Sequence, residues 1–506
     1  MLQSPVIAAS PLVGTPAWRN ALRWRQWCFL ALLAAGLFLF SDGLTAPLAL
    51  KDESRNANNA LDMTLTGFSL VTTYDFRPDL WNTKPPLVIW LMSGSLRLFG
   101  FHEWALRLPS ALAAIGTLGL CLWFVRKVTG SRGLSVGAAI LLLLSPGFFG
   151  EHGARTADFD AVLLFFVTGG LQFLYLASLR RRPGWPPLIA AGGMIGLGAL
   201  AKSIAAFIPV VGVLLFLLLG RRLTSVLANW QRYLLTGLAS ILPLLAFYAA
   251  REAAGPGYLD AVIFNDLAGR YSRSLIPETS PLFYLEHLSK GWFFTGPLLL
   301  ILPIGLRGLG NREKTLALYA GCIVFAALAI YSAAATRAMQ YALPLFPWLA
   351  ILSAISLKRL IGIFAVDRWK AGKRLVPVAL IIGLSLLGAQ LTARALWWRY
   401  EMFPARQSGP QASYGHLFAT LAARGLTHVA IVDPGFQREQ EQGYSPLLRW
   451  HRLVWATCGL HTTELRTTPA FSATLIASCE PSVYETWQPS SVERIGLCAV
   501  RNPQPG

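Results

Sequence analysis

Long apolar runs recur along almost the whole chain, and they constrain its fold more than any other feature. Each run holds roughly 17–25 residues, enough for one helix to cross about 30 Å of hydrocarbon. Of the 506 residues, 54% are hydrophobic and only 14% are charged, whereas a water-soluble domain has about a quarter charged residues. The mean hydropathy is +0.49. The sequence therefore predicts an all-α polytopic membrane protein and excludes a soluble enzyme with a single anchor.

The boundaries of the apolar runs predict about 11 transmembrane helices. We expect them near Trp27–Leu50, Leu108–Val125, Leu134–Phe149, Ala161–Leu179, Pro187–Leu200, Ile204–Leu219, Tyr233–Ala250, Trp292–Leu306, Leu316–Ala334, Tyr341–Leu357 and Leu375–Ala393. Two amphipathic helices, Ala57–Thr66 and Pro85–Leu98, are expected along the membrane surface in the first external loop.

Basic residues fall in small groups between the apolar runs, and this alternation orients the chain. Arg19, Arg23 and Arg25 precede the first run, and a triple arginine stands at 180–182. Because such groups collect in cytoplasmic loops, we expect a cytoplasmic N-terminus and an external C-terminus. No small-residue cleavage site follows the first apolar run, so we expect a retained signal-anchor helix, and the helical spans indicate a bacterial inner membrane. The net charge of +19 is spread over these groups, which argues against nucleic-acid binding.

The tail 397–506 differs in composition from the apolar transmembrane domain expected at 1–396. It has shorter apolar runs, with helical spacing at Tyr414–Arg424 and strand-like segments at 427–433, Ala473–Ser478 and Arg494–Val500. We expect a small external (periplasmic) α/β domain. Three cysteines lie in it, and the sequence leaves open which two of them pair. They are Cys458, Cys479 and Cys498.

Ionisable residues are concentrated in stretches expected to face outward, chiefly 51–110, 151–160 and 251–290. Charged groups beside hydrocarbon are costly, so they mark a functional site by default. Cations there can hold a lipid phosphate and stabilise it as a leaving group, while a carboxylate takes a proton from the acceptor. The pattern indicates a phosphorylated lipid whose headgroup reacts with a hydroxyl or phosphate acceptor.

Several motifs resemble those of the GT-C polytopic glycosyltransferases, in particular bacterial protein O-mannosyltransferases and aminoarabinose (lipid A) transferases. The resemblance rests on DESR at 52–55, KPPLVIWL at 84–91, LFGFHEWALRLPSALA at 98–113, HGARTADFDAVLLFF at 152–166, AKSIAAFIP at 201–209, FNDLAGR at 264–270 and QYALPLFPWLA at 340–350. It covers about residues 20–400 in the family's order. The family implies inverting transfer of a sugar from a polyprenyl-phosphate donor to a lipid, glycan or protein acceptor at the external face.

The resemblance also implies roles for individual residues. Asp52 matches the first acidic position, which acts as a base or positions the acceptor, and Glu53 is its neighbour. Asp158 and Asp160 bracket the second acidic position, and Asp160 is the closer match. The expected substrate-binding residues are Arg55, Lys84, Arg155, Arg270 and Tyr341.

One position departs from the family. Aminoarabinose transferases commonly have an acidic residue before the Lys-Pro pair, where this chain has Thr83. No cofactor is required by the sequence, no histidine or cysteine pair has zinc spacing, and a divalent metal ion is left open. A transporter or flippase for lipid-linked sugars is the alternative function. It would show internal repeats and polar or broken spans; we find no internal repeat in the sequence, and the ionisable residues cluster in the expected external loops.

Overall fold

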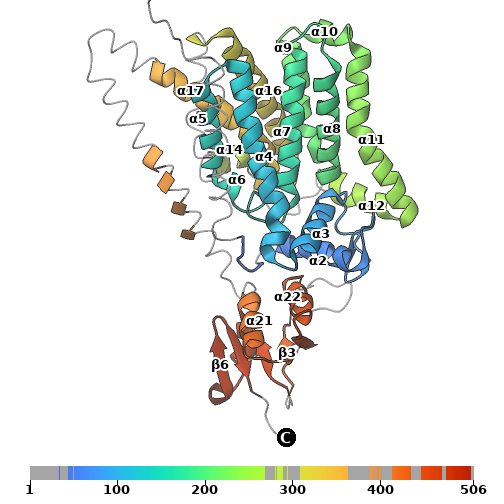
Figure 1. Ribbon diagram of the computed structural model, residues 1–506, viewed down its shortest axis with the longest axis vertical. Helices are drawn as coiled ribbons and strands as arrows, with labels where there is room; N and C mark the ends of the chain where they lie inside the picture. The colour runs from blue at the N-terminus through green and yellow to red at the C-terminus, as the bar shows by residue number, and fades with distance from the viewer. Residues whose placement is uncertain are drawn as a thin grey trace, which may run out of the picture.

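The computed structural model is mostly helical, with a small sheet near the C-terminus (Figure 1). Long helices lie side by side in the bundle, and α2 (Lys51–Thr66) and α3 (Leu87–Phe99) lie at its lower end, between the bundle and the sheet. Besides a few isolated positions, the structure describes residues 44–48, 51–267, 282–288, 308–362, 413–434, 446–465, 467–469 and 474–502.

Within the described ranges, six helices are long and apolar enough to cross a membrane. They are α4 (Glu103–Thr129), α7 (Phe159–Ser178), α8 with its 3₁₀ extension (Trp185–Ala206), α11 (Trp230–Ala254), α16 (Asn311–Ala333) and η7 joined to α17 (Met339–Ile361). The shorter apolar helices are α3, α5 (Arg132–Leu143) and Ile208–Leu219, which includes α9 (Val211–Leu219). A multi-pass membrane protein is therefore confirmed.

The other described helical segments of the bundle are short. They are α6 (Pro146–Phe149), η1 (Ser203–Ala206), η2 (Ile208–Val210), α10 (Leu223–Leu227), α12 (Tyr258–Val262), the π-helix η3 (Ile263–Leu267) and α14 (Phe283–His287).

The expected number of 11 spans is only partly matched. The expected spans Trp27–Leu50, Trp292–Leu306 and Leu375–Ala393 lie almost entirely outside the described residues. The expected span Leu134–Phe149 is divided into the 12-residue helix α5 and the single turn α6. The expected span Ile204–Leu219 consists of two 3₁₀ turns followed by α9.

Helix α4 begins at Glu103, five residues before the expected Leu108, and contains Pro109. A proline inside a helix has no N–H for the carbonyl four residues earlier, which here belongs to Ala105. The hydroxyl of Ser95 donates to that carbonyl at 2.5 Å. Because this contact from α3 satisfies the acceptor, the helix continues through the proline, and the polar segment before α4 is shorter than expected.

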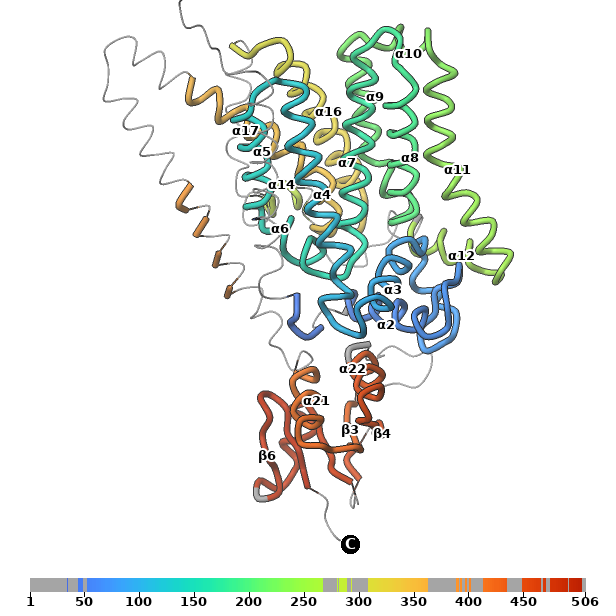
Figure 2. Tube along the Cα trace, viewed as in Figure 1, coloured from blue at the N-terminus to red at the C-terminus, as the bar shows by residue number. Residues whose placement is uncertain are grey.

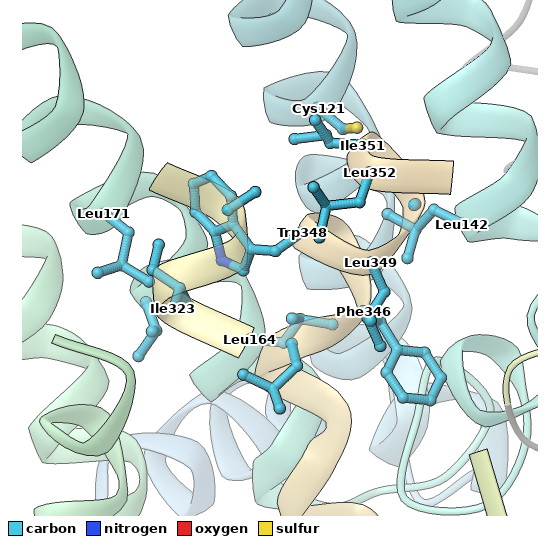
Figure 3. Packing of buried hydrophobic residues seen from close by; sticks show 14 of the residues in the cluster. Cys121, Leu142, Leu164, Leu171, Ile323, Phe346, Trp348, Leu349, Ile351 and Leu352 are labelled. Atoms are coloured by element: carbon cyan, nitrogen blue, oxygen red, sulfur yellow. The ribbon is translucent and has the colours of Figure 1, made fainter. Parts of the chain in front are cut away.

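The bundle core is built around Trp348 of α17, whose side chain is fully buried. Figure 3 shows it facing Leu171 and Ile323 from two other helices. Its ring centroid lies 5.4 Å from that of Tyr319 and 6.0 Å from that of Phe124, both near edge-to-face, an arrangement that aromatic pairs favour. The core therefore ties α4, α7, α16 and α17 together.

Helices α8 and α11 approach each other closely because α8 carries glycines at the contact. A side chain at Gly192 or Gly196 would meet the backbone of α11, at the carbonyls of Thr236 and Ala239 respectively. Small residues spaced by four allow this approach between spans. Near the lower end of α8, Leu200 packs against Tyr258 and Val262 of α12.

Helix α2 is not the surface-lying amphipathic helix that its sequence suggested. Its residues 53–63 are all buried, and its polar side chains are bonded internally. The Asn59 amide donates to the Asp79 carboxylate at 3.0 Å, and the Asn82 amide donates to the side-chain oxygen of Asn59 at 2.8 Å. The hairpin of β1 (Thr73–Tyr74) and β2 (Arg77–Pro78) follows it. The polar residues between positions 53 and 63 therefore face protein rather than water.

The C-terminal sheet has five strands in the order β4-β3-β5-β7-β6. They are β3 (His428–Val432), β4 (His461–Leu465), β5 (Ile476–Ser478), β6 (Val492–Ile495) and β7 (Cys498–Arg501). Strand β3 pairs in parallel with β4 and β5, whereas β7 pairs antiparallel with β5 and β6. The expected single strand Arg494–Val500 is wrong, because Gly496, with φ of 60°, turns the chain between β6 and β7.

Helices cover both faces of this sheet. Side chains of α21 (Ser413–Ala423) and α22 (Pro446–Ala456) pack with Val429 and Ile431, and side chains of α23 (Pro481–Tyr484) pack with Ala430 and Val432. The alternation follows from the two-residue period of a strand. A disulfide joins Cys479 to Cys498, and Cys458 is a free, exposed thiol.

One arginine links the sheet region to the loop segment that begins with α2. Helix α22 lies beneath α2 in Figure 2, and its Arg449 is 3% exposed. Its guanidinium donates to Asp62 at 2.7 Å, to Asn58 at 2.9 Å and to Asp75 at 3.1 Å. The neighbouring Trp450 is fully buried in a cluster with residues of α2, α3 and α4. The tail therefore packs on the same loop that carries the predicted catalytic residues.

Candidate active site

A cavity of about 90 Å³ lies at the lower end of the bundle, between α7, α8 and η7 (Met339–Leu345). Its polar lining includes Lys84, Asp160, Lys202, Asp266, Thr336 and Tyr341. Its apolar lining includes Leu163, Ile204, Ile208 and Pro344. Two lysines and two carboxylates therefore meet beside a wall of hydrocarbon side chains.

Two carboxylates lie at the start of α7. Asp158 is the N-cap residue, and its Oδ1 accepts a 2.7 Å hydrogen bond from the backbone N–H of Phe159. Asp160 lies in the first turn and is 2% exposed. The N-terminal end of a helix carries partial positive charge, which offsets part of the cost of burying these two carboxylates.

His152 balances the charge of Asp158. Its Nδ1 contacts Oδ2 of Asp158. Burial opposes protonation of the imidazole, but the Asp158 carboxylate outweighs this effect and raises the pKa of His152 to about 9. Burial also opposes ionisation of Asp158, yet the charged His152 holds the pKa of Asp158 below its usual value. The two side chains therefore form an imidazolium–carboxylate pair at neutral pH.

Lys202, the last residue of α8, pairs with Asp160. Its Nζ donates to both carboxylate oxygens, at 2.6 and 2.5 Å. The same Nζ lies 5.8 Å from the centre of the Tyr341 ring. The Lys202 and Asp160 side chains are 12% and 2% exposed, and charges so far from water persist only when they are paired and hydrogen-bonded. The pair therefore fixes a cation in the wall of the cavity.

Lys84 meets a carboxylate from a distant segment. Its Nζ lies 3.4 Å from Oδ1 of Asp266, and the Thr83 hydroxyl donates to Oδ2 at 2.7 Å. The hydroxyl of Tyr258 donates to the backbone carbonyl of Thr83 at 2.7 Å. Although residue 83 is a threonine, η3 brings a carboxylate to the same place. Lys84 therefore has an acidic neighbour despite the departure in sequence.

Glu53 forms a buried ion pair with Arg107 and does not line the cavity. Its two oxygens accept from Nε and Nη2 of Arg107 at 2.6 and 3.1 Å, and Oε1 also accepts from the backbone N–H of Ala157 at 2.9 Å. Both side chains are completely buried. Arg107 also donates to the carbonyls of Leu44 and Ala46. This pair ties α2 to α4 and to the loop before α7, so Glu53 holds the site together.

The remaining predicted residues have different positions. Asp52 is exposed in the first turn of α2, directly before Glu53. Arg55 and Arg155 are buried at 9% and 1% exposure, and the guanidinium of Arg55 lies 6.0 Å from the centre of the Trp81 ring. Arg270 lies outside the described residues. Of the predicted set, Lys84, Asp160 and Tyr341 line the cavity together.

Sequence reasoning missed roles for Lys202, Asp266, Arg107 and the protonated His152. The first three stand inside motifs that carry the family resemblance, at 201–209, 264–270 and 98–113. Their positions in those motifs were a usable signal. The sequence did not reveal the partners of these three residues, because each of the three ion pairs joins residues between 42 and 182 positions apart.

Three side chains could supply ligands to a metal ion. One ligand atom each from His152, Asp158 and Asp160 lie within 4.8 Å of one another. A nitrogen and two carboxylates are a plausible donor set. However, His152 is protonated against Asp158, and both oxygens of Asp160 accept from Lys202. A cation would have to displace a proton and an ammonium group, so the cluster as placed fits its internal ion pairs better than a metal.

Residues 83–247 match the model of the family described as dolichyl-phosphate-mannose-protein mannosyltransferase. The undecaprenyl phosphate-alpha-4-amino-4-deoxy-L-arabinose arabinosyl transferase 1 of Pseudomonas fluorescens is 26% identical over 354 residues, 69% of this chain and 61% of that protein. The putative mannosyltransferase YycA of Bacillus subtilis is 31% identical, over 28% of this chain and 20% of its own length. The chain thus spans less than two thirds of these curated relatives.

Solved structures share the fold. ArnT from Cupriavidus metallidurans bound to undecaprenyl phosphate aligns with a TM-score of 0.67 at 16% identity, over 96% of this chain and all of ArnT. The oligosaccharyltransferase AglB from Archaeoglobus fulgidus, in complex with an inhibitory peptide and a dolichol-phosphate, aligns with a TM-score of 0.52 at 14% identity, over 91% and 70% of the two chains. The chain has the polytopic fold of the GT-C glycosyltransferases. Its sequence is similar to their aminoarabinose and mannosyltransferase branch.

Proposed function

We propose that the chain transfers a sugar from a polyprenyl-phosphate donor to a lipid, glycan or protein acceptor at the external face of the inner membrane. The observation that carries this proposal is the cavity in which Lys84 and Lys202 meet beside apolar side chains of the spans. Lysines bind phosphate as point charges, and the apolar wall suits the first isoprene units of the tail. The names of the similar proteins support the same donor class.

On the donor side, Lys84 and Lys202 hold the phosphate and the Tyr341 hydroxyl donates to it. The 3.4 Å contact between Lys84 and Asp266 is longer than that between Lys202 and Asp160, so Lys84 is the cation more easily redirected to a ligand. Both lysines stabilise negative charge as the phosphate leaves. Arg270, three residues past the end of η3, is proposed as a further phosphate contact.

On the acceptor side, Asp52 is the proposed base. It is exposed, while the neighbouring Glu53 is fixed by Arg107 and Ala157, so the backbone under Asp52 is held in place. If the acceptor is a hydroxyl, Asp52 takes its proton; if the acceptor is an ionised phosphate, Asp52 only orients it. Attack opposite the leaving phosphate inverts the anomeric carbon.

The other predicted residues position the groups that hold the donor and the acceptor. Asp160 orients Lys202, and Asp158 with His152 fixes the start of α7. In this proposal Glu53 is a positioning residue. Arg55 and Arg155 are proposed to keep the surrounding carboxylates ionised, because a nearby cation favours the charged form.

We also propose 11 spans, a cytoplasmic N-terminus and a periplasmic α/β domain at 397–506 following the transmembrane domain 1–396. The Cys479–Cys498 disulfide supports this placement of the tail, since structural disulfides persist in oxidising compartments such as the periplasm. The basic groups at the opposite end of the bundle support it independently. Modification of lipid A is one form that the proposed transfer can take.

The test compares cells that lack the gene with cells complemented by the wild type, Asp52→Asn, Lys84→Gln or a distant control, Arg424→Gln. Mass spectrometry of lipids and envelope glycans should show an accumulated polyprenyl-phosphate sugar and a missing sugar modification, restored by the wild type and by Arg424→Gln only. Full restoration by Asp52→Asn would overturn its catalytic role. Donor trapped in the cytoplasmic leaflet, with transfer intact in permeabilised membranes, would identify a flippase instead.

A further inference from the structure

A second and larger cavity, of about 800 Å³, opens at the end of the bundle opposite the candidate active site. It lies between the last turns of α4 and α7 and the first turns of α8 and α16. Its basic residues are Lys127, Arg180 and Arg312. Its apolar wall includes Trp123, Phe173 and Leu176. The proposed transfer reaction uses none of these residues.

The three cations converge without a counter-charge. Among the described residues, none of them has a carboxylate partner, and Glu313, which follows Arg312, pairs with Lys358 of α17 instead. All three side chains are exposed. Three positive charges around one cavity repel each other, so the arrangement favours an anionic occupant.

The wall beside the cations is apolar and aromatic. The rings of Trp123 and Phe173 lie 5.6 Å apart, and the ammonium group of Lys127 lies 5.5 Å from the centre of the Trp123 ring. Trp123 is 39% exposed, and aromatic residues at the ends of spans commonly sit at the level of lipid headgroups. A small free anion would contact the cations but not this apolar wall.

We propose that this cavity binds one anionic phospholipid of the cytoplasmic leaflet. Lys127, Arg180 and Arg312 hold its phosphate, and Trp123, Phe173 and Leu176 contact the upper part of its acyl chains. Basic pockets between spans on the cytoplasmic side are a known setting for anionic headgroups. The bound lipid bridges α4, α7, α8 and α16 at the end where Arg312 and Arg180 would otherwise repel each other.

The experiment titrates phosphatidylglycerol into the full-length protein in neutral detergent, with phosphatidylcholine of the same chains and glycerol phosphate as comparison probes. Binding is counted by native mass spectrometry and by the shift of the unfolding temperature. We expect one phosphatidylglycerol to bind in preference to both comparison probes. Equal binding of phosphatidylcholine would overturn the role of the charge, and equal binding of glycerol phosphate would overturn the role of the apolar wall.

Matched variants locate the site. The double variant R180Q/R312Q should weaken phosphatidylglycerol binding about 25-fold, since each cation near a lipid surface contributes about fivefold. The double variant R181Q/K314Q removes two cations from the same end that do not line the cavity, and it should bind as the wild type does. Equal losses in the two variants would mean diffuse attraction to the basic end and would overturn the site.

A third variant guards against a folding artefact. Trp123→Gln alters an exposed wall residue while leaving every cation in place, and it should weaken phosphatidylglycerol binding without changing the weak binding of glycerol phosphate. Unfolding temperatures without lipid establish that each variant is folded. Wild-type affinity for phosphatidylglycerol in folded Trp123→Gln would contradict the proposed contact with acyl chains.

Discussion

The two ends of the helix bundle use charge in opposite ways. At the end with the candidate active site, each acidic side chain of three ion pairs meets a cation from another segment. The pairs are Glu53–Arg107, Asp160–Lys202 and Asp266–Lys84. At the opposite end, Glu313 is the one acidic residue in the described segments 120–134, 174–190, 214–234, 308–316 and 354–362, among many lysines and arginines.

The charged side chains of the two ends differ in burial as well as in the sign of their charge. The paired charges near the active site are almost completely withdrawn from water, where removing one partner leaves the other buried and uncompensated. The cations at the basic end are largely exposed, so water solvates them and they do not depend on a buried counter-charge. Buried ion pairs therefore fix the geometry of the active-site end, whereas the charges of the basic end remain largely in contact with water.

The sharpest test removes one acid from each end. Glu53→Ala should lower the free energy of unfolding by about 3–5 kcal/mol, because it leaves Arg107 buried without its partner. Glu313→Ala should lower it by at most about 1 kcal/mol, because its partner Lys358 is 49% exposed. Denaturant unfolding in detergent measures both. Similar losses in the two variants would contradict the proposed difference between the ends.

The next largest effect concerns the cavity itself. Lys202→Gln should reduce sugar transfer about 100-fold, the loss typical when one group that stabilises developing negative charge is removed. Asp160→Asn should also reduce transfer, because Lys202 then loses its orientation. Since the two side chains are in contact, the double variant should lose much less than the product of the single losses. Independent losses would show that the pair does not act as a unit.

A third effect is set by pH. The pKa of His152 is raised above its usual 6.5 to about 9. The stabilisation by its pair with Asp158 is therefore fully present below pH 6.5 and is lost as pH rises through 9. The unfolding temperature of the wild type should fall between pH 7 and pH 10, and His152→Gln should remove that component of the slope.

His451 supplies the control for this pH effect. It is buried as the neutral form, and burial lowers its pKa to about 3, so it does not titrate between pH 7 and pH 10. His451→Gln should leave the slope of unfolding temperature against pH unchanged in that range. If both histidine variants flattened the slope equally, another group would be responsible for it.

Much of the fold and some of the site follow from local sequence. Apolar length locates the six long described spans to within a few residues. Motif positions point to Lys84, Asp160 and Tyr341, which line one cavity although they lie up to 257 positions apart in the chain. Prediction works here because each motif sits at the end of a span, and the spans themselves are defined by composition. Alternate spans reach the same side of a membrane.

The rest depends on contacts that local patterns do not encode. Helix α2 has an amphipathic sequence, but α22 covers its polar face through Arg449, 387 residues beyond Asp62. The early start of α4 depends on Ser95 satisfying the carbonyl exposed by Pro109. The carboxylate beside Lys84 comes from η3 rather than from residue 83. In each case a partner from another segment overrides the local signal.

The smallest predicted effect compares a buried and an exposed acidic residue that contact the same arginine. Arg449 contacts both Asp62, whose side chain is fully buried, and Asp75, whose side chain is 60% exposed. Asp75→Asn should change the free energy of unfolding by about 0–1 kcal/mol, since an exposed pair contributes little. Asp62→Asn should cost several times more, because Arg449 is then left buried without its main partner. Denaturant unfolding of the two variants measures the difference, and an equal cost would show that burial of the acid does not decide how strongly the tail is held against α2.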